Sequence, residues 1–65
     1  MKLWEAFEML EKKGFKYIGS KNELDVLTYF YEHPETGEVV KVFDWWGEAV
    51  IVTVKKPKKK KGEKK

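Results

Sequence analysis

Residues 24–44, LDVLTYFYEHPETGEVVKVFD, decide the fold because they contain two strand-forming runs joined by a turn. Leu24–Glu32 is rich in β-branched and aromatic residues, and both of its faces are largely apolar. This pattern predicts a central strand that a helix covers on one face and that is partly exposed on the other. His33–Gly37 supplies a proline for the second position of a type I turn and a glycine for a positive φ. Glu38–Asp44 is then the returning strand of a hairpin.

Strand and turn signals continue on both sides of this hairpin. Asp44–Gly47 predicts a second turn, which leads into Glu48–Val54, the strongest strand run of the chain. On the other side, Phe15–Ile18 predicts a short first strand, and the polar residues 19–22 predict a break after it. The sequence therefore indicates an antiparallel meander of three or four strands.

An amphipathic helix is predicted over about residues 2–13. Apolar residues recur there at the spacing of one helical face, at Leu3, Ala6, Phe7 and Leu10. Lysines occupy the last turn, and Gly14 follows where a left-handed residue commonly ends a helix. Phe15 is expected to fold back onto the last turn. The predicted fold class is α+β, with this helix packed on the meander as a single domain of residues 1–54.

The charge of the chain is divided between two parts of opposite sign. All fourteen basic residues are lysines, and eight of them lie within Lys55–Lys65, where Glu63 is the only acidic residue, so this segment carries +7. Residues 1–54 hold six lysines and ten carboxylates, a net charge of −4. The basic character therefore belongs to the tail. Because nothing apolar offsets its ordering entropy, we expect residues 55–65 to be disordered.

Composition argues against an enzyme or a metalloprotein. There is no cysteine, and a single histidine, His33, does not make a metal centre by itself. His33 opens the predicted turn and lies between two glutamates, which is typical of a solvated surface loop. No phosphate-binding glycine loop or nucleophile motif is present. We therefore expect no catalytic residues, no cofactor and no metal.

The chain shows neither a signal peptide nor an apolar run long enough to span a membrane. A cytoplasmic protein that does not act at membranes, and that is monomeric by itself, is the expectation. Its richness in lysine and glutamate, together with the lack of arginine, glutamine and cysteine, matches a bias reported for hyperthermophile proteins.

The lysine tail suggests one function, the binding of nucleic-acid phosphates or of an acidic partner. Lysines at these positions would bind by counterion release without reading sequence, and the alternative is a merely solubilising end. The absence of arginine argues against base recognition. The electrostatic candidates are Lys55, Lys56, Lys58, Lys59, Lys60, Lys61, Lys64 and Lys65.

Aromatic residues suggest two further sites. Tyr29 and Tyr31, with Tyr17, are a candidate platform for stacking single-stranded bases, although their acidic neighbours would repel a polyanion. Trp45 and Trp46 are the stronger candidate. Because adjacent residues point to different sides, one tryptophan is expected in the core and the other at the surface as an anchor for a protein partner. The alternative is that both cover the open end of the core.

The segment Val39–Trp46 resembles the PCNA-interacting box of proteins that dock on the DNA sliding clamp. Val42 stands at the aliphatic position and Trp45 and Trp46 at the aromatic positions, whereas Val39 stands where the box has glutamine. With its small size and its lysine and glutamate content, the chain is similar to small archaeal inhibitors of PCNA, which act in DNA replication. The resemblance implies that the tryptophans fill the hydrophobic pocket of the clamp and that the N-terminal helix extends the contact.

A second resemblance is to HicA-type toxins, which are small ribonucleases with a fold like that of double-stranded-RNA-binding domains. Glu8–Phe15 and His33-Pro34 resemble the first helix and hairpin of that family. The catalytic histidine of that family is missing, since Lys21 follows Gly19-Ser20, and no second helix is predicted after Val54. The resemblance therefore implies a related fold without the nuclease activity.

These observations favour a non-enzymatic protein-binding module, with the sliding clamp as the candidate partner. The predicted partner-binding residues are Leu3, Trp4, Phe7, Val42, Phe43, Trp45 and Trp46. The alternative is a nonspecific nucleic-acid-binding protein that acts through its lysine tail.

Overall fold

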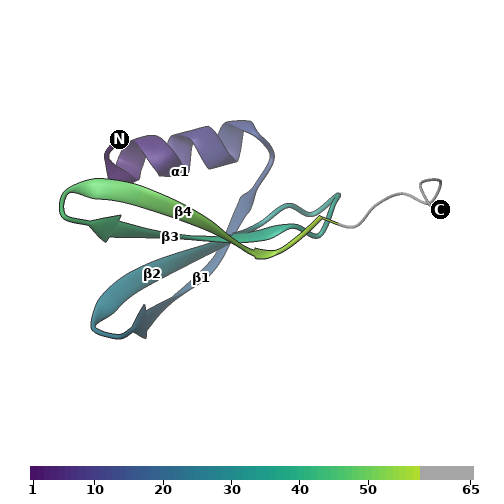
Figure 1. The fold of residues 1–65 in the computed structure, drawn as a ribbon. Coiled ribbons are helices and arrows are strands. Elements are labelled where there is room, and N and C mark those ends of the chain that lie inside the picture. The colour runs from purple at the N-terminus through teal and green to yellow at the C-terminus, as the bar shows by residue number, and fades with distance from the viewer. Residues whose placement is uncertain (58–65) are drawn as a thin grey trace.

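The structure, a computed structural model that describes residues 1–57, has one helix packed on a four-stranded antiparallel sheet (Figure 1). The elements are α1 (Leu3–Lys12), β1 (Lys16–Glu23), β2 (Val26–Glu32), β3 (Val39–Trp45) and β4 (Glu48–Lys55). The strands lie in the sheet in the order in which they follow along the chain. The predicted α+β meander with an N-terminal helix is confirmed. Of the predicted disordered tail, Lys55 is instead the last residue of β4, paired with Val39, and residues 58–65 lie outside the described residues.

Both ends of α1 are closed by hydrogen bonds. At its start, a carboxylate oxygen of Glu5 accepts a hydrogen bond from the backbone N–H of Lys2 at 2.7 Å. At its end, Gly14 has a φ of +99° and donates to the carbonyl of Glu11, and Phe15 donates to the carbonyl of Leu10 at 2.9 Å. This pair of bonds is a Schellman motif, which turns the chain back and buries Phe15 as predicted.

The hydrophobic core lies between α1 and one face of the sheet. Phe7 of the helix packs on two tyrosines of β2, with ring centroids 5.0 Å from Tyr29 and 5.7 Å from Tyr31. The alternative that the tyrosines form an open base-stacking platform is therefore wrong, because the helix covers these two rings. The buried apolar residues are Ala6, Leu10, Phe15, Tyr31, Val40 and Val42.

The first hairpin differs from the sequence prediction. β1 does not stop at Ile18 but continues through the polar residues 19–22, after a bulge between Tyr17 and Gly19. The turn comes later, at Leu24-Asp25, where both residues have positive φ, +50° and +65°. This is the backbone pattern of a type I′ turn, which joins two strands by two residues. The prediction that Leu24 begins the central strand is therefore wrong.

The turn between β2 and β3 and the turn between β3 and β4 lie where the sequence predicts them. Gly37 has a φ of +80° and donates to the carbonyl of His33 at 2.8 Å, which closes the β2–β3 turn. The β3–β4 turn consists of Trp46 and Gly47, both with positive φ, so it is also of type I′.

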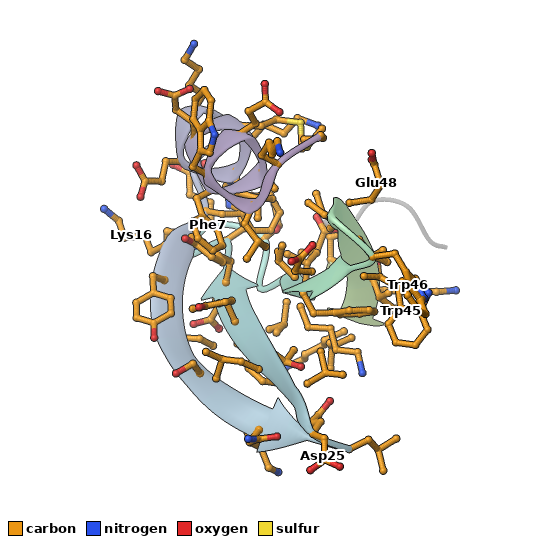
Figure 2. All side chains as sticks on the ribbon, turned by 90° about the vertical axis from the view of Figure 1, so that its left-hand side faces the viewer. Phe7, Lys16, Asp25, Trp45, Trp46 and Glu48 are labelled. Carbon is orange, nitrogen blue, oxygen red and sulfur yellow. The ribbon has the colours of Figure 1, made fainter. Side chains whose placement is uncertain are left out.

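The two hairpins separate towards their turns. β2 and β3 are paired from Glu32 and Val39 to Thr28 and Phe43, and no pairing is present beyond this point among the strand residues described. The β1–β2 hairpin and the β3–β4 hairpin therefore diverge, as Figure 1 shows at the end of the sheet opposite the turn between β2 and β3. Their turns are well apart in Figure 2, where Asp25 marks one and Trp46 the other.

Candidate interaction surface

The helix covers only one face of the sheet, and we call the other the open face. Strand pairing places Thr28, Phe43 and Val50 side by side in one row across this face, and Phe30, Lys41 and Val52 in the next row. Because side chains alternate along a strand, Val26 and Trp45 belong to the same face. The open face is thus formed by Val26, Thr28, Phe30, Lys41, Phe43, Trp45, Val50 and Val52.

A cleft of about 250 Å³ lies on the open face where the hairpins diverge. Both hairpins contribute to its walls, and most of its surface is apolar. The cleft is lined by Glu23, Leu24, Val26, Thr28, Lys41, Phe43 and Trp45. Its size is somewhat below that of sites for drug-sized ligands, and it suits one or two apolar side chains.

The polar groups of the cleft already have partners within the chain. Thr28 is almost fully buried, and its hydroxyl donates to the carbonyl of Val26 at 3.2 Å. The ammonium group of Lys41, on β3, lies 3.3 Å from a carboxylate oxygen of Glu23, on β1, so this ion pair crosses over β2.

A row of aromatic rings leads from the cleft to the tip of the β3–β4 hairpin. The ring centroids of Phe43 and Trp45 are 6.3 Å apart, and those of Trp45 and Trp46 are 6.5 Å apart, both in edge-to-face geometry. Trp45 is 53% exposed and Trp46 is 89% exposed. Both project away from the helix in Figure 2. The prediction that one tryptophan enters the core is wrong, because the two-residue turn places Trp45 on the open face and Trp46 in the turn itself.

Two exposed apolar residues have backbone conformations that their side chains disfavour. Trp46 has a φ of +54°, and Leu24, which is 96% exposed, has a φ of +50°. Both stand at the first position of a type I′ turn, where asparagine, aspartate or glycine is usual. A left-handed backbone costs an L-residue about 1–2 kcal/mol. Neither side chain regains this cost by burial in the described fold.

The structure divides the predicted partner-binding residues into three groups. Phe43, Trp45 and Trp46 form the aromatic row. Val42 points to the other side of β3 and is fully buried in the core, so it does not reach a partner while the sheet is intact. The helix residues Leu3, Trp4 and Phe7 lie away from the cleft and line a separate groove with Asp44 and Gly47, in which Trp4 is 61% exposed.

Sequence reasoning missed the half of the cleft that comes from the first hairpin. The sequence prediction puts Leu24 in a strand and includes neither Val26 nor Thr28 among the binding residues. A signal was available, because alternate residues of Leu24–Glu32 are apolar on both faces and the helix covers only one of them. No pattern in the sequence indicated that the two hairpins diverge, and this divergence is what creates the cleft.

His33 connects the end of the helix to the β2–β3 turn. Its Nε2 lies 3.0 Å from the carbonyl oxygen of Lys13, and its Nδ1 accepts a hydrogen bond from the backbone N–H of Glu35 at 3.2 Å. With Nδ1 acting as an acceptor, Nε2 is the ring nitrogen that donates to the carbonyl of Lys13. The ring also packs edge-on against Phe15 at 5.1 Å. These contacts support a structural role for His33.

Charged groups are arranged at both ends of β4. At its start, the N-terminal ammonium lies 2.9 Å from a carboxylate oxygen of Glu48. The hydrogen bond and the attraction between them raise the pKa of the ammonium and lower the pKa of Glu48. At its other end, Lys55 and Lys56 are exposed. The remaining six candidate tail lysines lie outside the described residues.

Comparisons with known protein families, curated proteins and solved structures found no match. Within residues 1–57, no helix has the length and apolar character required to cross a membrane. The same part of the chain holds no cluster of three or more histidine, aspartate or glutamate side chains placed to bind a metal ion.

Proposed function

We propose that the chain is a non-enzymatic protein-binding module that uses its open face. A partner inserts one or two apolar side chains into the cleft and packs on the ring of Trp45, with Trp46 and Leu24 closing over it from the two hairpin turns. Exposed aromatic residues next to an apolar cavity are the usual anchors of protein interfaces.

The observation that carries this proposal is the pair of exposed apolar residues at left-handed turn positions. Leu24 and Trp46 each retain an unfavourable backbone, and neither is stabilised by burial. Backbone strain of this kind is concentrated at functional sites. Leu24 lines the cleft, and Trp46 continues the aromatic row that begins there, so both residues would become buried when a partner occupies the open face.

The sliding clamp remains the specific partner to test. The two aromatic positions of the PCNA-like box, Trp45 and Trp46, are exposed and adjacent, which supports the proposal. Val42 is buried, so the box would have to bind as a hairpin tip rather than as a coiled peptide.

A titration of the clamp with the full chain tests this function. We expect the double substitution Trp45→Ala with Trp46→Asn to weaken binding at least about tenfold, since hot-spot residues contribute 2 kcal/mol or more. Ile18→Ala is the matched control, because Ile18 is exposed to the same extent as Trp45 but lies on β1. Unchanged affinity in a folded double variant would exclude the tryptophans as the anchor. Absence of any clamp binding would restrict the proposal to another protein.

The lysine tail supports a second candidate function, nonspecific nucleic-acid binding. Its charge of +7 is separate from the body of −4, so it is available to phosphates without a basic face on the sheet. The logarithm of the affinity should then fall with the logarithm of salt concentration, with a slope near the number of phosphates contacted. Deletion of residues 55–65 should abolish this binding, whereas the tryptophan variants should not affect it. Binding that survives the deletion would contradict the assignment to the tail.

A further inference from the structure

The two edges of the sheet differ in how they are protected. β1 carries Lys16 and Lys21, and a bulge follows Tyr17, features that discourage pairing with another strand. β4, the opposite edge, has no charged residue between Glu48 and Lys55 and consists of β-branched residues from Val50 to Val54. Such an edge is a template for a further strand.

The part of β4 that can accept a strand is short and sharply bounded. The backbone N–H of Ala49 points away from β3 and donates to the carbonyl of Met1 at 2.8 Å, so the start of the edge is covered. Near the other end, Val39 and Val40 pair with Lys55 and Thr53, which makes Val54 a bulged residue. Because backbone groups alternate along a strand, Ile51 and Thr53 present their N–H and C=O groups to the same side as Ala49.

We propose that β4 pairs antiparallel with β4 of a second copy of this chain, about a two-fold axis at Val52. In this register Ile51 of each copy lies opposite Thr53 of the other, and each pair exchanges two backbone hydrogen bonds. The two Val52 side chains meet on the axis as a non-hydrogen-bonded pair, where Cα atoms are about 4.5 Å apart. The two sheets become one, and the open faces lie on the same side of it.

Charge complementarity identifies a second copy as the occupant of this edge. Within one copy, Glu48 and Lys55 are separated by the length of β4, roughly 24 Å. Antiparallel pairing about Val52 instead directs Lys55 and Lys56 of one copy towards the end of the other copy that holds Glu48, where Met1 covers Ala49, and this happens twice in the dimer. Asp44 and Glu5 lie at the same end as Glu48, because Asp44 pairs with Ala49 and Glu5 acts electrostatically on the N-terminal ammonium next to Glu48. The ammonium and Lys2 also lie at this end, so the three carboxylates exceed the two positive groups by one charge.

The sequence adds to this complementarity. Six further lysines follow in residues 58–65, so the +7 segment of each copy begins beside the acidic end of its partner. The monomer expected from the sequence is then the state of the dilute protein. The inference is independent of the proposed function, because the cleft and the two tryptophans take no part in the pairing.

Sedimentation of the full chain tests the proposal, over concentrations from about 10 μM to about 1 mM, where weak association is detected. We expect a concentration-dependent dimer that salt weakens. The amide protons of Ile51 and Thr53 should exchange slowly with solvent in the dimer but not in the monomer. Val52→Lys and Val52→Glu should each abolish the dimer, because each places like charges on the two-fold axis. An equimolar mixture of the two variants should associate again, because opposite charges then meet on the axis. Val52 is partly exposed, so both variants should fold.

Ile18→Lys, the same type of change at an exposed position of the opposite edge, should leave the dimer intact. A full chain that stays monomeric throughout this range would overturn the proposal. A dimer that Val52→Lys does not affect would overturn it as well, since its interface would lie elsewhere, for example on the open face. Failure of the two charged variants to associate when mixed is the third contrary result.

Discussion

Trp46 is the residue at which stability and function are most clearly in conflict. Its left-handed backbone is unfavourable for a bulky side chain, and asparagine followed by glycine is the preferred pair for a type I′ turn. We expect Trp46→Asn to raise the free energy of unfolding by about 1 kcal/mol. Urea unfolding followed by circular dichroism measures this change.

Leu24→Asn is the matched control for that substitution, because Leu24 occupies the same position of the other type I′ turn. Both substitutions should stabilise the fold if the backbone strain is the cause. A lower free energy of unfolding for Trp46→Asn alone would mean that the contact between the rings of Trp46 and Trp45 outweighs the strain.

Gly14 is required for two reasons, its backbone and its neighbour. Its φ is +99°, and a Cβ atom placed there would lie 2.9 Å from Nε2 of His33. We expect Gly14→Ala to lower the free energy of unfolding by about 2–3 kcal/mol, from the left-handed backbone and the displaced hydrogen bonds of His33. Thermal or urea unfolding gives the value.

Gly37→Ala separates the two causes. Gly37 also has a positive φ, +80°, but a Cβ atom there would meet nothing within 4 Å. Gly37→Ala should lower the free energy of unfolding by the backbone contribution only, about 1 kcal/mol. Equal losses for the two alanine variants would contradict a structural role for the contact between Gly14 and His33.

Individual residues also explain where prediction from the sequence succeeded and failed. Gly14 indicated the end of the helix and Gly37 indicated the turn between β2 and β3, because glycine is the residue that these backbones favour. Leu24-Asp25 carried no such signal, and the glycine and polar residues of 19–22 suggested a break instead. Those residues are tolerated in a strand because β1 is an edge strand, and pairing with β2 overrides their low strand propensity.

At the scale of elements, the helix, the central hairpin and the order of the strands followed from periodicity, whereas the binding surface did not. The strand-forming run Leu24–Glu32, apolar on both faces, predicted a central strand covered by the helix on one face, and the structure confirms this for Val26–Glu32. The cleft depends instead on where the pairing of β2 with β3 stops, which is a property of two strands together. The exposure of both tryptophans is also a property of two strands together, because it depends on β3 and β4 being joined by a turn of only two residues.

The start of α1 and the start of β4 are connected by an ion pair whose contribution depends on pH. The pKa of Glu48 is lowered in the folded chain, so its contribution to stability is present above its ordinary value of 4.5 and is lost as the pH falls through the folded pKa. The pKa of the ammonium is raised, so its contribution is complete below 8.0 and is lost as the pH rises through the folded pKa. The pair is therefore fully effective between about pH 5 and pH 8.

Glu48→Gln should lower the unfolding midpoint within this window, and the difference should disappear as the pH falls through the folded pKa of Glu48 or rises through the folded pKa of the ammonium. Both groups are exposed, so the effect should be small and should decrease with salt. Glu8→Gln is the control, because Glu8 forms no ion pair among the described residues. A pH-independent difference between Glu48→Gln and the parent chain would assign the effect to something other than the ion pair.

For the whole molecule, the question is whether the charged tail takes part in the fold. Residues 1–57, the part that the structure describes, form a core and a four-stranded sheet, and the composition of the lysine-rich segment offers no apolar surface to compensate for its ordering entropy. Deletion of residues 58–65 should therefore leave the free energy of unfolding unchanged within about 0.5 kcal/mol, the usual range for surface changes. Dilute protein in urea, where the chain is monomeric, is the sample for this measurement.

The same deletion should have a large effect on association, because it removes six lysines and one glutamate and changes the net charge from +3 to −2. In low salt the dimer of the shortened chain should be weaker than that of the full chain, and in high salt the two should converge as the charges are screened. The contrast between an unchanged fold and a changed, salt-dependent association identifies the tail as an accessory to binding. A loss of folding stability on deletion would instead make residues 58–65 part of the folded domain.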